Sequence, residues 1–167
     1  MADGMSETNQ KAVLGWREWI ALPDLGLPHI KAKIDTGART SCLHAFKVKG
    51  FRRRGVRWVR FHVHPHQGDR HTEVVCEAPV KDRRWVTDSG GHRTLRYVID
   101  AGIVVGKQRY SIELTLTNRD NMKFRMLLGR TAMYDHFIVD PQRSYCQERL
   151  ELTSQEWENE EEQAEIE

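Results

Sequence analysis

The stretch Ile30-Lys31-Ala32-Lys33-Ile34-Asp35-Thr36-Gly37-Ala38 places an acid, a hydroxyl residue and a glycine directly after an apolar and basic run. We expect Asp35 at the end of a strand, where a carboxylate can activate a water molecule. The Thr36 hydroxyl would fix the loop, and Gly37 would let backbone approach the carboxylate closely. An ordinary turn after a buried strand is the alternative, because Asp and Gly are common turn residues.

A second motif, Met126-Leu127-Leu128-Gly129-Arg130, lies far downstream. Two apolar residues followed by Gly-Arg, in this order after Asp-Thr-Gly-Ala, resemble the element that cradles the catalytic loop of retroviral aspartic proteases. The resemblance implies a catalytic loop made of Asp35, Thr36 and Gly37. It also implies that the loop is supported by Ala38, Leu128, Gly129 and Arg130.

Three segments, 15–19, 34–41 and 118–130, together resemble one bacterial retropepsin-like family that carries the name ATP-dependent zinc protease. The similarity spans about residues 14–141. Members of this family are often encoded beside ATP-grasp ligases that add glutamate to proteins. The resemblance implies a closed retropepsin-like (acid protease) β-barrel that acts on a peptide or protein. The gene context makes a glutamate-rich substrate and an ATP-grasp ligase partner our expectations.

Composition limits the possible classes of protein. A chain of 167 residues is long enough for one domain with a substantial core. Its 39% hydrophobic and 30% charged residues are typical of a soluble globular protein. No run approaches the roughly 18 apolar residues of a membrane helix, and residues 1–11 lack the apolar core of a signal peptide. Widely spaced cysteines without a Cys-x-x-Cys pair predict reduced thiols and a cytoplasmic location: Cys42, Cys76 and Cys146.

Charge is distributed unevenly along the chain. A basic stretch runs from Lys47 to Arg60, and acidic residues crowd the end between Glu156 and Glu167. We expect a disordered N-terminus over 1–12 and a mobile acidic tail over 154–167, since like charges repel and little there is apolar. The sequence between them, 13–153, is expected to form one retropepsin-like domain.

The apolar pattern between those ends has a period of two, which is typical of strands with one buried face. Residues 110–117 alternate between apolar and polar, and so do residues 59–64. Turn signals separate the runs at 67–69, 88–91, 106–107 and 118–121. We therefore predict a mainly β fold, a closed β-barrel, with one short helix over 131–136.

The segment Asp88-Ser89-Gly90-Gly91-His92 has two interpretations. Asp88 supplies a second catalytic acid, as in two-lobed pepsins, or the segment is the tip of a hairpin. The tip is favoured because strand-like runs flank it, and because Gly91 and the polar His92 stand where the catalytic motif has a small apolar residue. Its position between the two motifs matches the flap of retropepsins, the mobile lid that closes over substrate.

Aspartic proteolysis uses two carboxylates that share one proton around a water molecule. The chain supplies one Asp-Thr-Gly-Ala motif, so two chains would meet across a two-fold axis with each Asp35 facing its copy. Two such close carboxylates would titrate as a unit and retain one proton over a mildly acidic range. We predict a homodimeric aspartic-type peptidase that binds an extended peptide. The alternative is a module that binds a peptide or a ligase partner without cleaving it.

One position departs from the retroviral pattern. Retroviral enzymes place an acid soon after Asp-Thr-Gly-Ala, where it pairs with the arginine of Gly-Arg. Here Arg39 follows instead. Arg130 therefore needs another partner or faces solvent.

A metal site is the rival chemistry that the family name suggests. His62 and His64 lie two residues apart on a predicted strand, so their side chains share one side and are close enough to bind zinc. A solvated strand face is favoured, because Pro65 disturbs the alternation before His66 and no general base accompanies the pair. No cofactor is expected, since residues 102–108 are one residue short of a phosphate loop.

The basic stretch interleaves Phe51 and Trp58 with arginines, a pattern that suits nucleic acid or an acidic peptide. A charged strand face and loop is the favoured interpretation, because the net charge of the whole chain is only +2. Nucleic acid is therefore not expected as a partner. A basic surface would also suit a glutamate-rich substrate.

Overall fold

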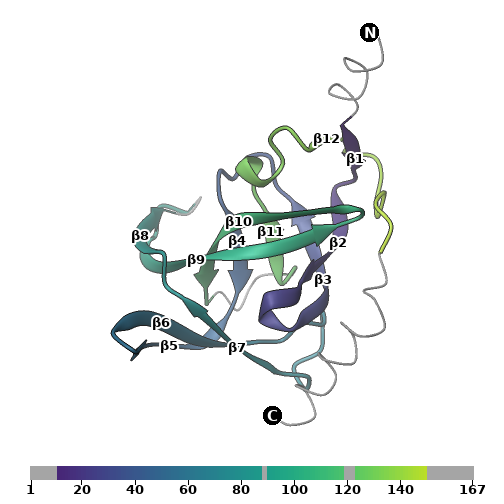
Figure 1. The fold of residues 1–167 in the computed structure, drawn as a ribbon. Helices are drawn as coiled ribbons and strands as arrows, with labels where there is room; N and C mark the ends of the chain where they lie inside the picture. The colour runs from purple at the N-terminus through teal and green to yellow at the C-terminus, as the bar shows by residue number, and fades with distance from the viewer. Residues whose placement is uncertain (1–10, 88–89, 119–122, 150–167) are drawn as a thin grey trace, which may run out of the picture.

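The computed structural model describes residues 11–87, 90–118 and 123–149 (Figure 1). The predictions made for the two chain ends beyond these ranges, and for Asp88 and Ser89, lie outside the described residues. Within the described part, strands account for most of the chain and one barrel dominates the fold (Figure 1). The described residues include no helix that is both long and apolar enough to cross a membrane.

The barrel strands follow one another in the order β10, β4, β11, β3, β2 and β9, and β9 pairs again with β10 to close the ring. Their bounds are β2 (Arg17–Leu22), β3 (Leu27–Ile34), β4 (Ser41–His44), β9 (Arg93–Val105), β10 (Gln108–Thr117) and β11 (Met126–Leu128). Strand β8 (Asp82–Thr87) extends the sheet beyond β9. The predicted closed, mainly β barrel is confirmed.

Parallel pairings bring distant parts of the chain together. β11 pairs with β3, with Leu128 opposite Ile34, and β10 pairs with β4, with Leu114 opposite Ser41. The apolar residues Ile112, Leu114 and Leu116 of β10 are buried in the core, as the period of two predicts. Thr115 and Thr117 on the other face are buried as well, so the second half of the strand is covered on both sides. β9 and β10 are joined at Gly106, which has a φ of 56° that favours glycine. This hairpin turn occupies the segment compared above with a phosphate loop.

A second sheet projects from the barrel at the lower left of Figure 1. It contains β5 (Phe46–Arg53), β6 (Val56–Val63) and β7 (Val74–Pro79) in antiparallel order. We call the β5–β6 hairpin the arm. Val59, Phe61 and Val63 of β6 are fully buried, as their alternation predicts.

The short elements differ in part from the prediction. A parallel pair, β1 (Ala12–Leu14) and β12 (Phe137–Val139), flanks the barrel. The helix expected over 131–136 is instead a 3-10 turn, η2 (Arg130–Ala132). A further 3-10 turn that was not predicted, η1 (Pro23–Leu25), begins with proline, whose fixed φ suits a first helical position.

A buried carboxylate fastens the beginning of the domain to its end. Glu18 is fully buried, and its two oxygens accept N–H bonds from Gly15 (2.6 Å), Cys146 (2.9 Å) and Gln147 (3.0 Å). A buried carboxylate is tolerated when its oxygens are hydrogen-bonded in this way. We call this arrangement the Glu18 clasp.

Candidate active site

The loop from Asp35 to Ala38 leaves β3 where that strand meets β11. The Asp35 N–H donates to the carbonyl of Leu128 (2.9 Å), and the Asp35 Oδ1 accepts the N–H groups of Gly37 (3.0 Å) and Ala38 (3.2 Å). Asp35 is partly buried, and its Oδ2 accepts no hydrogen bond from the described residues. One carboxylate oxygen therefore holds the loop, while the other stays available.

The Thr36 side chain lies on the exposed side of this loop. The sequence predicts that its hydroxyl fixes the loop, and across a dimer axis that role involves a second chain. Within the described part of this single chain, the hydroxyl makes no hydrogen bond. Backbone N–H groups of Gly37 and Ala38 hold the loop instead.

The residues after β11 support the Asp35 loop and the residue that follows it through hydrogen bonds. The Arg130 N–H donates to the Ala38 carbonyl (2.7 Å), and the Thr131 N–H donates to the Arg39 carbonyl (3.1 Å). The Thr131 hydroxyl donates to that same carbonyl at 2.9 Å. The two motifs therefore lie against each other, in the arrangement that the resemblance implies.

Gly129 lies where two backbones approach closely. A Cβ at this position would lie 2.5 Å from the Thr40 carbonyl carbon, so a larger residue requires the backbone to shift. The Gly129 N–H donates to the hydroxyl of Ser41 (3.0 Å), which is buried. Sequence reasoning missed Ser41 and Thr131 as supports, although both lie within or beside the quoted motifs.

Arg130 finds a partner other than an acid. Its Nη1 donates to the carbonyl of Thr36 (3.0 Å), and its Nε donates to the hydroxyl of Tyr134 (3.3 Å). Arg130 thus binds the backbone of the Asp35 loop at the place where the retroviral pattern uses a carboxylate. Arg130 therefore has partners within the chain, although the sequence has Arg39 where the retroviral pattern has an acid.

A groove of about 720 Å³ lies beside the loop, and we call it the Arg39 groove. Its walls come from the loop after Ala38, from β8, from β10 and from η2. Asp35 is not among the residues that line it. Its charged and aromatic lining residues are Arg39, Arg84, Trp85, Tyr110, Glu113 and His136.

The wall of the groove formed by β10 carries an aromatic pair. His136 stacks on Tyr110 with ring centroids 4.1 Å apart, and the Tyr110 hydroxyl donates to the Ala132 carbonyl. Burial raises the pKa of the Tyr110 hydroxyl well above its ordinary value. The phenol therefore stays neutral and acts as a hydrogen-bond donor. Sequence reasoning missed this pair, because its residues are distant in the chain.

Strands β8 and β9 form the predicted hairpin. Thr87 pairs with Arg93 at the end of the ladder, so residues 88–92 connect the two strands. Gly91 has a φ of 83°, which suits a turn. Trp85 is 58% exposed and lines the Arg39 groove. The hairpin interpretation of this segment is therefore supported on its described residues, and its closing over substrate remains a prediction.

A second hollow, of about 350 Å³, also touches the loop. Thr36, Arg130 and Tyr134 line it, and we call it the Tyr134 hollow. The Tyr134 side chain is 55% exposed. Residues of the Asp35 loop and of the segment directly after it thus line two hollows: Thr36 lines the Tyr134 hollow, and Arg39 lines the Arg39 groove.

The two histidines considered for zinc make other contacts. The His62 Nδ1 contacts Glu73, and the His64 Nδ1 lies 3.0 Å from the Thr72 carbonyl oxygen. The Phe46 ring stacks on His64 with centroids 4.4 Å apart. Among the residues that the structure describes, no group of three or more His, Cys, Asp or Glu residues is placed to hold a metal ion.

A closed barrel with a strand-end Asp-Thr-Gly-Ala loop cradled by Leu-Leu-Gly-Arg defines a retropepsin-like protein. The model of the RimB-like family, described as "Retropepsin-like aspartic endopeptidase RimB", matches residues 13–150. The chain belongs to this family.

Curated relatives and a solved structure are also similar. The chain is 48% identical to proteins of Desulfotalea psychrophila (82% of this chain, 30% of that protein) and Shewanella pealeana (83% and 30%), both named "Probable alpha-L-glutamate ligase". It therefore spans less than a third of the length of these relatives. A crystal structure of the Legionella pneumophila protein Lpg0085, described as of unknown function, matches with a TM-score of 0.68 at 28% identity, covering 81% of this chain and 98% of that chain.

Proposed function

We propose that the protein is an aspartic-type peptidase that hydrolyses peptide or isopeptide bonds with water activated at a pair of Asp35 side chains. The Asp35 carboxylate carries this proposal. Two N–H groups fix its Oδ1, and its Oδ2 has no hydrogen bond from the described residues. A carboxylate fixed at one oxygen and available at the other suits a general acid or base.

The second carboxylate is proposed to come from a second copy of the chain. Each chain brings one Asp-Thr-Gly-Ala loop, and the described loop has the Tyr134 hollow beside it. An exposed aromatic ring next to a hollow is a common feature of an interface. We propose that Thr36 and Tyr134 contact the partner in the homodimer.

The proposed substrate is a glutamate-rich peptide. Arg39 lines the groove and forms no ion pair with any described residue. An arginine that directly follows the Asp35 loop and lines a groove suits recognition of a substrate carboxylate. The relatives whose names refer to glutamate ligation support this substrate class, and an ATP-grasp ligase is the partner we propose.

Cleavage of a diverse peptide library, read by mass spectrometry between about pH 4 and 7, tests the proposal, since a shared-proton pair should work in this range. Wild type and Asp35→Asn are compared with and without a chelator, and glutamate-tagged peptides are compared with neutral ones. We expect cleavage that Asp35→Asn abolishes and that the chelator does not change.

Each other result points to a different function. Cleavage lost with chelator would move the chemistry to a metal site such as the His62 and His64 pair. Equal cleavage of neutral and glutamate-tagged peptides would reject the substrate class. A protein that binds glutamate-tagged peptides but cleaves none would favour the non-catalytic binding module.

A further inference from the structure

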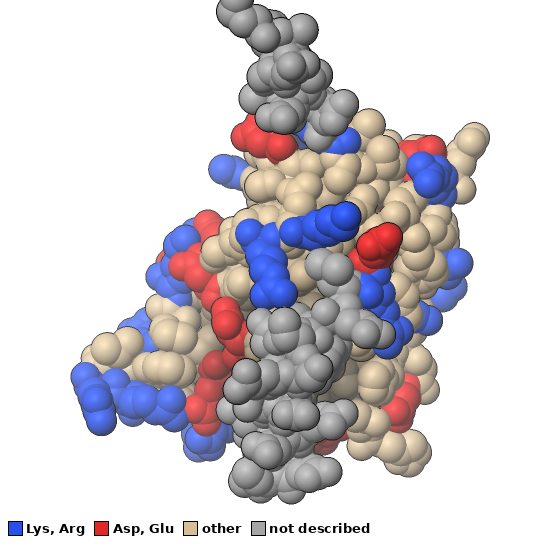
Figure 2. Space-filling view, turned by 45° about the vertical axis from the view of Figure 1, so that its right-hand side comes forward, with Lys and Arg blue, Asp and Glu red and all other residues tan. Residues whose placement is uncertain are grey.

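The arm presents two faces with different chemistry. Pairing of β5 with β6 places Arg53, Phe51 and Lys49 on one face, which we call the outer face, opposite Val56, Trp58 and Arg60. The other face, which we call the inner face, carries Arg52 directly opposite Arg57, and Gly50 opposite Val59. Figure 2 shows Lys and Arg side chains gathered on this projecting part of the molecule, at its lower left.

The two arginines of the outer face share one acidic partner. Arg53 and Arg60 both pair with Glu77, with N–O distances of 2.6 Å and 2.8 Å. Their guanidinium groups also cover the aromatic rings, at 4.4 Å from the Trp58 centroid for Arg53 and 5.3 Å from the Phe51 centroid for Arg60. The two outer-face arginines are therefore engaged by Glu77 and by the aromatic rings, which distinguishes them from the arginines of the inner face.

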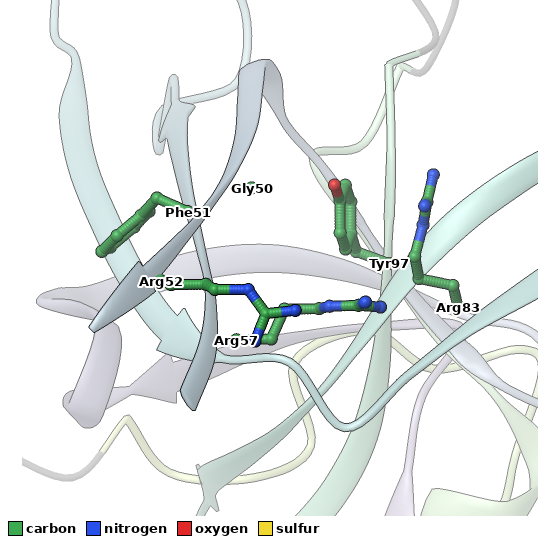
Figure 3. A pocket seen from close by; sticks show the side chains of 6 residues that line it. All are labelled: Gly50, Phe51, Arg52, Arg57, Arg83 and Tyr97. Atoms are coloured by element: carbon green, nitrogen blue, oxygen red, sulfur yellow. The ribbon is translucent and has the colours of Figure 1, made fainter. Parts of the chain in front are cut away.

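The inner face faces the barrel across a pocket of about 260 Å³ (Figure 3). The Arg52 and Arg57 side chains reach from the arm towards Tyr97, and Arg83 lies beside Tyr97, whereas the Phe51 ring points away from them (Figure 3). Arg83 and Tyr97 are themselves opposite each other in the β8–β9 ladder. Two cross-strand pairs from different sheets thus line one small pocket.

The three arginines of this pocket have no acidic partner among the described residues. Arg52 donates only to the Gly55 carbonyl (3.4 Å), and the Arg83 guanidinium lies 4.9 Å from the Tyr97 ring centroid. The nearest acid in sequence, Asp82, is bound to the side chain of Arg84 at 2.7 Å. Like charges directly opposite each other on a sheet are destabilising, so an anion in the pocket would offset their repulsion.

We propose that this pocket binds a phosphate group, either free or as part of a single-stranded nucleic acid. The planar fork of arginine matches phosphate oxygens, and several arginines balance a group that carries more than one negative charge. A single carboxylate would leave most of this charge unbalanced. The Tyr97 ring, over which the Arg83 guanidinium lies, places an aromatic group in the same pocket. The inference does not depend on the proposed peptidase activity.

Strand alternation connects the pocket with the groove. Arg83 lines the pocket, and the next residue, Arg84, lines the Arg39 groove and pairs with Glu113 at 2.8 Å. A phosphate held by Arg52, Arg57 and Arg83 would tie the arm to the strand that forms one wall of the groove.

Fluorescence anisotropy and calorimetry on the full chain test the site. The probes are inorganic phosphate, uridine monophosphate, a short labelled oligouridylate and an oligoglutamate peptide of equal length. We expect the phosphate probes to bind, with affinity reduced about tenfold or more in Arg57→Ala and in Arg83→Ala, because each change removes a charge-assisted contact. Arg53→Ala, which removes the same charge from the outer face, is the matched control and should change affinity less than about twofold.

The results distinguish nucleic acid from a free nucleotide as the source of the phosphate, and a phosphate ligand from an acidic peptide. Tight binding of oligouridylate alone would identify nucleic acid as the source of the phosphate, and equal binding of the monophosphate would identify a free nucleotide. Preference for oligoglutamate, with the same dependence on Arg57 and Arg83, would overturn the phosphate assignment in favour of an acidic peptide. Equal loss in Arg53→Ala, or no binding of any probe to a wild-type chain that is folded by circular dichroism, would overturn the site itself. Arg57→Gln and Arg83→Gln serve as a second pair if the alanine variants unfold.

Discussion

The carboxylates of Glu18 and Asp35 lie in the same barrel but differ in burial and in how many of their oxygens accept hydrogen bonds. Both accept backbone N–H groups. Glu18 is fully buried, and both of its oxygens are used. Asp35 is partly buried, with its hydrogen bonds from described residues confined to Oδ1.

This difference shows how to separate a structural acid from a chemical one. A carboxylate whose oxygens are all satisfied has nothing left for a ligand, so its contribution is to the free energy of folding. A carboxylate fixed through one oxygen is positioned by the fold and can still exchange a proton with water or substrate. The predictions below test this separation, beginning with the largest effect.

Asp35→Asn is expected to lower peptide cleavage by about 10²–10⁴-fold, because the amide cannot act as an acid or base. The amide oxygen can still accept the N–H groups of Gly37 and Ala38, so the free energy of unfolding should change by less than about 1 kcal/mol. Initial rates and urea denaturation measure the two quantities. A large loss of stability with this variant would make Asp35 a structural acid like Glu18.

Glu18→Gln is expected to lower the free energy of unfolding by about 2–3 kcal/mol, because the NH₂ that replaces one carboxylate oxygen would face an N–H donor that has lost its acceptor, and because the remaining hydrogen bonds would lose their charge. Urea denaturation with the linear extrapolation gives this value. Asp140→Asn is the matched control, since Asp140 accepts a single N–H, that of Gln142 (3.0 Å), near the surface. Equal small losses in both variants would contradict the clasp.

Gly129→Ala is expected to cost about 1–3 kcal/mol of stability, because the new Cβ would meet the Thr40 backbone. The matched change Gly37→Ala should cost less than about 1 kcal/mol, since its Cβ meets only the Asp35 Oδ1, at 3.2 Å, and its φ is not in the left-handed region. Thermal melts of both variants make the comparison. The reverse ranking would mean that the cradle tolerates movement and the loop does not.

We also expect the free energy of unfolding to depend on pH through His29. Burial, with a smaller effect of the Arg149 charge and then of His66, lowers the pKa of His29 from 6.5 to about 4. His29 is therefore neutral in the folded chain where the unfolded chain would bind a proton. Its contribution to stability is complete above about pH 6.5, falls as the pH drops towards 4, and changes no further below that. Urea midpoints across this range should vary less in His29→Gln than in wild type.

The sequence predicts the strands whose apolar residues recur at every second position. Residues 110–117 and 59–64 show the alternation expected of strands, and strands β10 and β6 cover residues 110–117 and 59–63. The pairing of the Asp35 loop with Gly129 and Arg130 was accessible through resemblance, because each motif is short and continuous. The extent of the helix after Arg130 was not predicted correctly, since a few residues of 3-10 turn leave a weak periodic signal.

Other features depend on partners that are distant in the sequence. Glu18 sits in a strand beside Trp19 and looks like an exposed acid until Cys146 and Gln147 are placed against it. The arginines of the arm form one basic stretch in the sequence, and only the strand register separates Arg53, which is paired, from Arg57, which is not. Local patterns carry no information on such long-range pairs.

The Glu18 clasp also constrains when the domain can finish folding during its synthesis. Glu18 lies near the start of the domain and is synthesised before two of its N–H donors, Cys146 and Gln147, which lie near the end of the domain. β3 likewise cannot pair with β11 until β11 has been synthesised, which happens much later in the domain. Contacts between such distant residues slow folding. A nascent chain therefore cannot complete this barrel until nearly all of the domain has left the ribosome, and until then the Glu18 carboxylate stays in water.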